Sequence, residues 1–145
     1  MTPEIWADLF RQLAFISALV GGFAFAFLGT LLTLPSRSRI VDWTAGMALV
    51  TAAGLIICVI GWTLMASQVL ITASLGPGGE EYRFPAAFNS THSQLSQLFI
   101  VEMFFFLASL GLSGWVRSRT LGIVSSIVAL VAAVILMFVI SPFLH

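Results

Sequence analysis

The sequence predicts an all-α membrane protein in which four transmembrane helices form a bundle. Hydrophobic residues make up 59% of the 145-residue chain and charged residues only 8%, whereas an ordinary soluble domain carries about 25% charged residues. Four apolar stretches are long enough to cross a bilayer, which requires about 20 apolar residues in a helix. Pro, Gly or Arg interrupts the chain between them. We therefore expect one membrane domain over residues 1–145.

The predicted spans cover about residues 12–34, 44–73, 95–115 and 120–142. Glu4 and Asp8 precede the first span, whereas a secretory signal begins with basic residues, so this span is expected to stay in the mature protein. The second span would be about 45 Å long if continuous, so it should tilt or protrude from a hydrocarbon core of about 30 Å. An outer loop is expected at residues 76–94.

Four arginines predict the orientation of the chain. Arg37 and Arg39 lie between the first two spans, and Arg117 and Arg119 lie between the last two, so both pairs fall on the same side of the membrane. The positive-inside rule places this side in the cytoplasm. Both termini and the 76–94 loop are then outside. We expect an integral protein of a bacterial inner membrane or a plasma membrane.

The two halves of the chain echo each other at an offset of about 80 residues. The segment FLGTLLTLPSRSRIVDWTAGMALV at 27–50 resembles FLASLGLSGWVRSRTLGIVSSIVALV at 106–131. Two repeated helical hairpins related by an axis along the membrane normal would produce this pattern. Unrelated apolar helices with Arg pairs at their turns would also produce it, so both interpretations stay open.

Small residues recur every four positions in the first span, at Ala18, Gly22, Ala26 and Thr30. Such a stripe lets two helix backbones approach closely in a membrane, where no hydrophobic effect drives helices together. The stripe therefore predicts that the first span contacts other helices. These helices belong either to the same bundle or to further copies around a pore or an oligomer seam.

The most unusual residue is Glu102, which lies within the apolar stretch FIVEMFFF at residues 99–106. An acidic side chain in a membrane span costs about 2.5–3.5 kcal/mol on insertion scales and is therefore a candidate functional residue. Ser109 lies on the same helical face, and Ser17 and Thr63 are expected at similar depth on neighbouring spans. Glu102 either hydrogen-bonds a neighbouring helix or relays protons or cations.

The sequence holds no pattern that predicts catalysis or a bound cofactor. No His, Cys, Asp and Glu residues are spaced as metal ligands, and no nucleophile elbow, P-loop or dinucleotide fingerprint occurs. We therefore expect no enzyme activity, no metal and no cofactor. Because six Arg balance six acidic residues, nothing favours nucleic acid as a partner. The expected partners are the lipid bilayer and either further copies of this chain or other membrane subunits.

One family resemblance arises in the first span. The segment SALVGGFAF, residues 17–25, resembles the start of the pore helix in Orai-type calcium channels, four-span proteins that assemble around a pore lined by their first helix. The pore acid of that family has no counterpart, since Gly29 and Thr30 occupy the region concerned. The termini in that family are cytoplasmic, opposite to the orientation predicted from the arginines. The resemblance implies a pore but not calcium selectivity.

Two functions therefore compete at the level of the sequence. The small-residue stripe and Glu102 favour a homo-oligomeric ion channel or an ion-conducting subunit. The scarcity of other polar residues that line a path favours a non-catalytic accessory or assembly subunit of a larger membrane complex.

Overall fold

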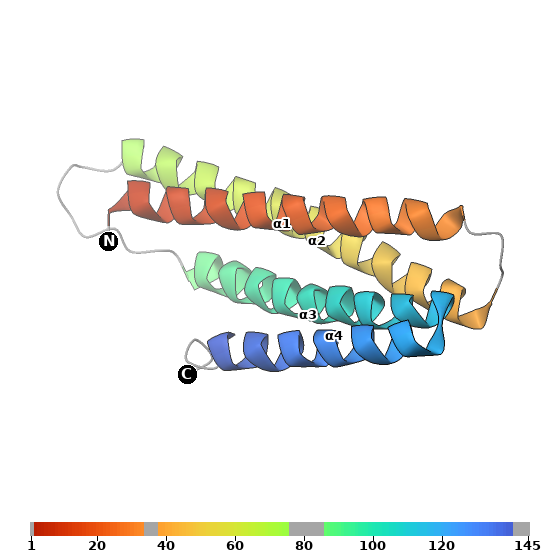
Figure 1. Cartoon of the computed structure of the whole chain (residues 1–145). Helices are drawn as coiled ribbons and strands as arrows, with labels where there is room; N and C mark the ends of the chain where they lie inside the picture. Colours follow the sequence, from red (N-terminus) through yellow and green to blue (C-terminus); the bar gives the residue numbers. More distant parts are fainter. Residues whose placement is uncertain (1, 34–37, 76–85, 141–145) are drawn as a thin grey trace.

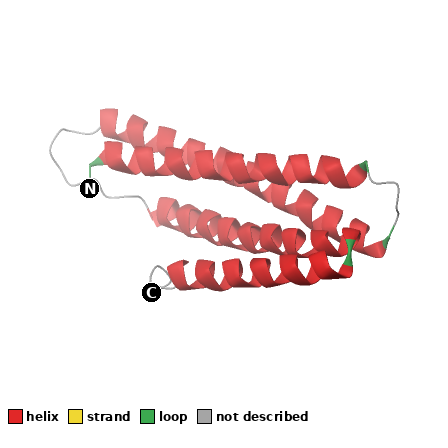
Figure 2. Cartoon of the chain, in the orientation of Figure 1, coloured by secondary structure: helices red, strands yellow, loops and turns green. Residues whose placement is uncertain are grey.

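Four helices make up nearly all of the described chain. The computed structural model describes residues 2–33, 38–75 and 86–140. Its helices are α1 (Pro3–Leu32), α2 (Arg39–Leu75), α3 (Ala86–Arg117) and α4 (Arg119–Ile140) (Figure 1). Within the described ranges no strand occurs (Figure 2). Each helix is long and apolar enough to cross a membrane, so the predicted all-α, four-helix fold class is confirmed.

The helices pack in chain order rather than as a symmetrical square. The main contacts join α1 to α2, α2 to α3, and α3 to α4. In Figure 1 the long α2 crosses obliquely behind α1, and α4 lies at the edge of the molecule beyond α3. The best-packed core lies near the start of α1, where Phe10 stacks on Trp62 of α2 with ring centroids 5.8 Å apart and also contacts Phe88 of α3.

Two helices begin well before their predicted spans. α1 begins at Pro3, where proline fits the first helical position and Glu4 complements the helix dipole. α3 begins at Ala86, so residues 86–94 of the expected outer loop belong to the helix, while 76–85 lie outside the described residues. The hydropathy pattern marks only the apolar part of a helix. The aromatic contacts of Phe10 and Phe88 extend the packed region into the more polar flanks.

Both short connections end in a serine that caps the next helix. The hydroxyl of Ser38 accepts a hydrogen bond from the N–H of Val41 (3.4 Å), and the hydroxyl of Ser118 accepts one from the N–H of Leu121 (3.2 Å). Each serine thereby satisfies a backbone donor that the first turn of a helix leaves without a partner. The Arg-Ser-Arg echo at residues 37–39 and 117–119 therefore has a local structural reason, whichever origin the two halves have.

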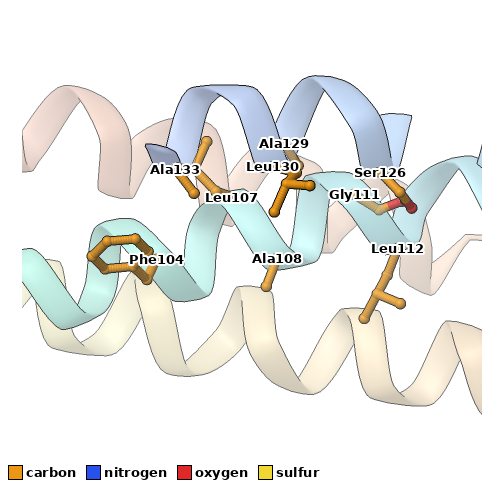
Figure 3. Close-up of a pocket in the computed structure, with 9 residues that line it drawn as sticks. All are labelled: Phe104, Leu107, Ala108, Gly111, Leu112, Ser126, Ala129, Leu130 and Ala133. Carbon is orange, nitrogen blue, oxygen red and sulfur yellow. The ribbon is translucent and has the colours of Figure 1, made fainter. Parts of the chain in front are cut away.

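The α3–α4 hairpin is held by hydrogen bonds between its helices. The indole N–H of Trp115 donates to the hydroxyl of Ser126 (3.0 Å), and the hydroxyl of Ser125 donates to the carbonyl of Gly111 (2.7 Å). Beyond them, the two helices border an apolar groove of about 540 Å³ (Figure 3). α4 contacts α3 along this side, while most of its other side chains are exposed.

Candidate functional site around Glu102

Glu102 lies halfway along α3, at the interface with α2. Only 5% of its surface is exposed. At about 1.5 Å per residue, it is about 22 Å from Arg117 at the end of the helix. Its Oε2 atom has no hydrogen-bond partner among the residues that the structure describes. The carboxyl group is therefore both buried in the protein and distant from the charged helix ends.

Gly54 of α2 provides the space that the Glu102 side chain occupies. A Cβ atom added at Gly54 would lie 2.7 Å from the Cγ of Glu102 and closer still to its carboxyl group. One heptad away on both helices, a Cβ atom added at Gly61 would lie 2.6 Å from a methyl group of Leu95. Two glycines of α2 thus receive two large side chains of α3, and the carboxyl group lies directly against the α2 backbone.

The other predicted polar residues do not form a cluster with Glu102. Ser17 and Ser109 are buried, but their hydroxyls donate to the carbonyls of Leu13 and Phe106 within their own helices. Thr63 is exposed, and its hydroxyl donates to the carbonyl of Val59. Such bonds to the preceding helical turn satisfy a hydroxyl without any partner from another helix. A continuous polar path through these four residues is not present in the described chain.

The predicted small-residue stripe lies on the surface of the chain. Ala18, Gly22, Ala26 and Thr30 are all exposed. The buried face of α1 is a different one: Ala7, Phe10, Ala14, Ser17, Gly21, Ala24, Leu28 and Leu31. A Cβ atom added at Gly22 would meet nothing within 4 Å, whereas one added at Gly21 would lie 3.2 Å from Leu55. Packing inside the bundle therefore uses the neighbouring face and leaves the stripe open.

The stripe and Glu102 belong to different surfaces. Ala18, Gly22 and Ala26 line a groove of about 480 Å³ between α1 and α2, whereas Glu102 lies between α2 and α3. The small-residue stripe and Glu102, which both favoured a channel at the level of the sequence, therefore do not line a common pore wall within this chain.

Three of the four arginines that predicted the topology mark one end of the bundle. Arg39 begins α2, Arg117 ends α3 and Arg119 begins α4, and all three are exposed. The ends of these helices lie together at one end of the molecule in Figure 1. Arg37 lies outside the described residues.

Two residues near the middle of α2 were not linked to Glu102 from the sequence. Gly54, like Gly61, is a glycine in an apolar span that allows close helix contact, and only the structure reveals that Glu102 is its neighbour. Thr51 is fully buried, and its Oγ1 atom has no partner among the described residues. The buried indole nitrogen of Trp62 also has no hydrogen-bond partner among the described residues. Such a contact could be sought in a sequence by looking for a glycine and an acidic residue that lie at equal depth in two antiparallel spans.

The fold defines the class of the protein as a small polytopic membrane protein, in which the acidic residue Glu102 is buried between two helices. Within the described ranges, no three His, Cys, Asp or Glu side chains are grouped so that they could hold a metal ion. Comparisons with known protein families, with curated proteins and with solved structures give no match.

Proposed function

We propose that the protein is a non-catalytic, homo-oligomeric ion channel, in which copies assemble with α1 toward a central axis. One observation carries this proposal: the exposed surface of α1 contains a stripe of small residues, and the exposed surface of α4 does not. The stripe consists of Ala18, Gly22, Ala26 and Thr30, and it lies beside large exposed side chains of the same helix, among them Phe15, Leu19 and Phe23. The exposed surface of α4 presents large apolar side chains, among them Ile127, Val128, Leu130, Ile135 and Met137.

This difference favours one arrangement in a bilayer. Large aliphatic side chains match lipid tails, so α4 is the edge expected to face lipid. Small residues are typical of helix–helix interfaces in membranes because they let backbones approach. A closed ring with α1 inside and α4 outside satisfies both preferences at once. The resemblance of residues 17–25 to an Orai-type pore helix supports the same arrangement.

A second function has its own observation. The open stripe of α1 contains no charged residue, and Glu102 lies away from it. An accessory or assembly subunit that binds a helix of a different membrane protein through α1 needs no polar path. This alternative keeps the role of the α1 face and changes the partner.

The oligomeric state and ion flux decide between these functions. The protein is purified in mild detergent, sized by light scattering and reconstituted into liposomes with dyes that report protons, potassium and calcium. We expect a ring of identical chains that increases the flux of at least one ion. Co-purification with foreign subunits, together with no flux above that of empty liposomes, would favour the accessory function and contradict the channel.

The orientation follows from the arginines, and we propose that the chain between α1 and α2 and the chain between α3 and α4 face the cytoplasm. In a variant whose native Cys58 is replaced by alanine, a cysteine is placed at Ser38 or at Gly79. A membrane-impermeant maleimide applied to intact cells should label Gly79→Cys and leave Ser38→Cys unlabelled until the membrane is opened. The reverse pattern would place both termini in the cytoplasm.

A further inference from the structure

Among the residues that the structure describes, no charged group pairs with the carboxyl group of Glu102. Its Oε2 atom is unpartnered among the described residues, and the side chain is 95% buried, with 5% exposed. The facing α2 has Cys58 as its only titratable residue between Asp42 and its end at Leu75. In sequence, residues 12–32 of α1, 93–116 of α3 apart from Glu102, and 120–140 of α4 contain no titratable residue.

An ionised carboxylate is therefore unfavourable at this position. Removing a charge from water costs several kcal/mol unless a countercharge and hydrogen bonds compensate. Neither compensation is present among the described residues. The neutral acid avoids this cost and gains an O–H donor that the carboxylate lacks.

Gly54 makes the α2 backbone available to such a donor. No side chain covers α2 at this position, and the carboxyl group lies against the backbone there. The carbonyl oxygens of a helix can accept a second hydrogen bond from a neighbouring hydroxyl, as those of Leu13 and Phe106 do from serines in this protein. A carboxylate at this position would instead place its negative charge close to the carbonyl oxygens of α2, and it has no O–H group to donate to them.

We propose that Glu102 and the turn of α2 at Gly54 form an intramembrane proton-binding site, in which the bound proton holds α3 against α2. The ligand is the proton itself, bound to a carboxyl oxygen of Glu102. Loss of the proton leaves a negative charge on the Glu102 carboxylate, close to the α2 backbone, and weakens the α2–α3 interface. This site does not depend on α1 assembly or ion conduction, so it stands or falls separately from the channel.

Infrared spectroscopy of the protein in liposomes tests the protonation state. The wild type should show the carbonyl stretch of a neutral carboxylic acid at pH 7, and Glu102→Gln should lack it. Five other acidic residues are present, Glu4, Asp8, Asp42, Glu80 and Glu81, and all lie in sequence outside the apolar centres of the spans. The wild-type band is therefore informative even if Glu102→Gln fails to fold. A wild-type spectrum with only carboxylate bands at pH 7 would overturn the proposal.

Unfolding measured against pH tests the coupling to the helix interface. The native state keeps a proton that the unfolded state releases once Glu102 is accessible to water, so stability should fall as pH rises. We expect the wild-type unfolding midpoint in mixed micelles to move to lower SDS fractions between pH 6 and pH 9. Glu102→Gln keeps the shape and an N–H donor, so it should lack this part of the shift. If the unfolding midpoints of the wild type and of Glu102→Gln shifted equally with pH, the proposed coupling between the proton and the α2–α3 interface would be overturned.

Discussion

Gly54→Ala is expected to destabilise the α2–α3 interface strongly. The added methyl group would occupy the space of the Glu102 side chain, whose Cγ would be 2.7 Å from the new Cβ. Cγ is only two bonds from the α3 backbone, so the side chain cannot simply rotate its far end away. Overpacking of this kind costs about 1–3 kcal/mol, and we expect about 3 kcal/mol here because a polar group must also be displaced.

Two glycines on the same helix provide matched controls for this result. At Gly61 the added methyl group meets the terminal methyl groups of Leu95, which can move by rotation, so Gly61→Ala should cost about 1 kcal/mol. At Gly46 nothing lies within 4 Å, and Gly46→Ala should not destabilise the fold. Unfolding by SDS in mixed micelles gives all three free energies. If Gly54→Ala and Gly46→Ala had the same free energy of unfolding, the close contact between Gly54 and Glu102 would be contradicted.

Gly22→Leu is expected to separate assembly from folding. The structure leaves open space around Gly22, so a single chain should accept the larger side chain. In a ring with α1 at its centre, the leucine would prevent close approach of the small-residue faces. We expect the dissociation constant of the oligomer to rise at least tenfold, about 1.4 kcal/mol per interface, and ion flux to be lost with it.

Gly46→Leu is the control for this experiment because Gly46 is also exposed, with nothing within 4 Å of an added Cβ. It lies on α2, away from the α1 edge, and its variant should remain oligomeric. Light scattering and the liposome assay are applied to both variants. An intact oligomer for Gly22→Leu, or an equal loss for both variants, would show that the α1 face is not the contact between copies.

The fold class could be predicted from the sequence because each helix contains a long apolar segment between charged or Pro- and Gly-containing breaks. The helix beginnings at Pro3 and Ala86 could not, since they depend on contacts between helices distant in the chain, such as Phe10 with Trp62 and Phe88. The apolar composition of a segment indicates that it can cross a bilayer. It does not specify which of the residues flanking that segment pack against other helices.

The candidate site was predicted in part. Glu102 stood out by itself because a carboxyl group is costly in a membrane span. The stripe at Ala18 to Thr30 was visible from its spacing, but α1 also carries small residues at Ala14, Ser17, Gly21 and Ala24. Periodicity does not distinguish two faces that are both lined with small residues. The neighbouring helix decides which face is buried, and in this chain α2 packs on the second one.

The contact between Glu102 and Gly54 also limits how α3 can slide along α2. A shift by one helical turn, about 5.4 Å, would bring the acidic side chain opposite Val50, Thr51, Ile57 or Cys58, and each of these carries a side chain where Gly54 has none. The other glycine of α2 nearest to Gly54 is Gly61, and bringing Glu102 opposite Gly61 would require α3 to slide by two helical turns. Polar residues in otherwise apolar helix pairs are known to specify alignment at a cost in stability. The fit of Leu95 against Gly61 restricts the same sliding movement, so Glu102 and Leu95 together fix the alignment of α3 on α2.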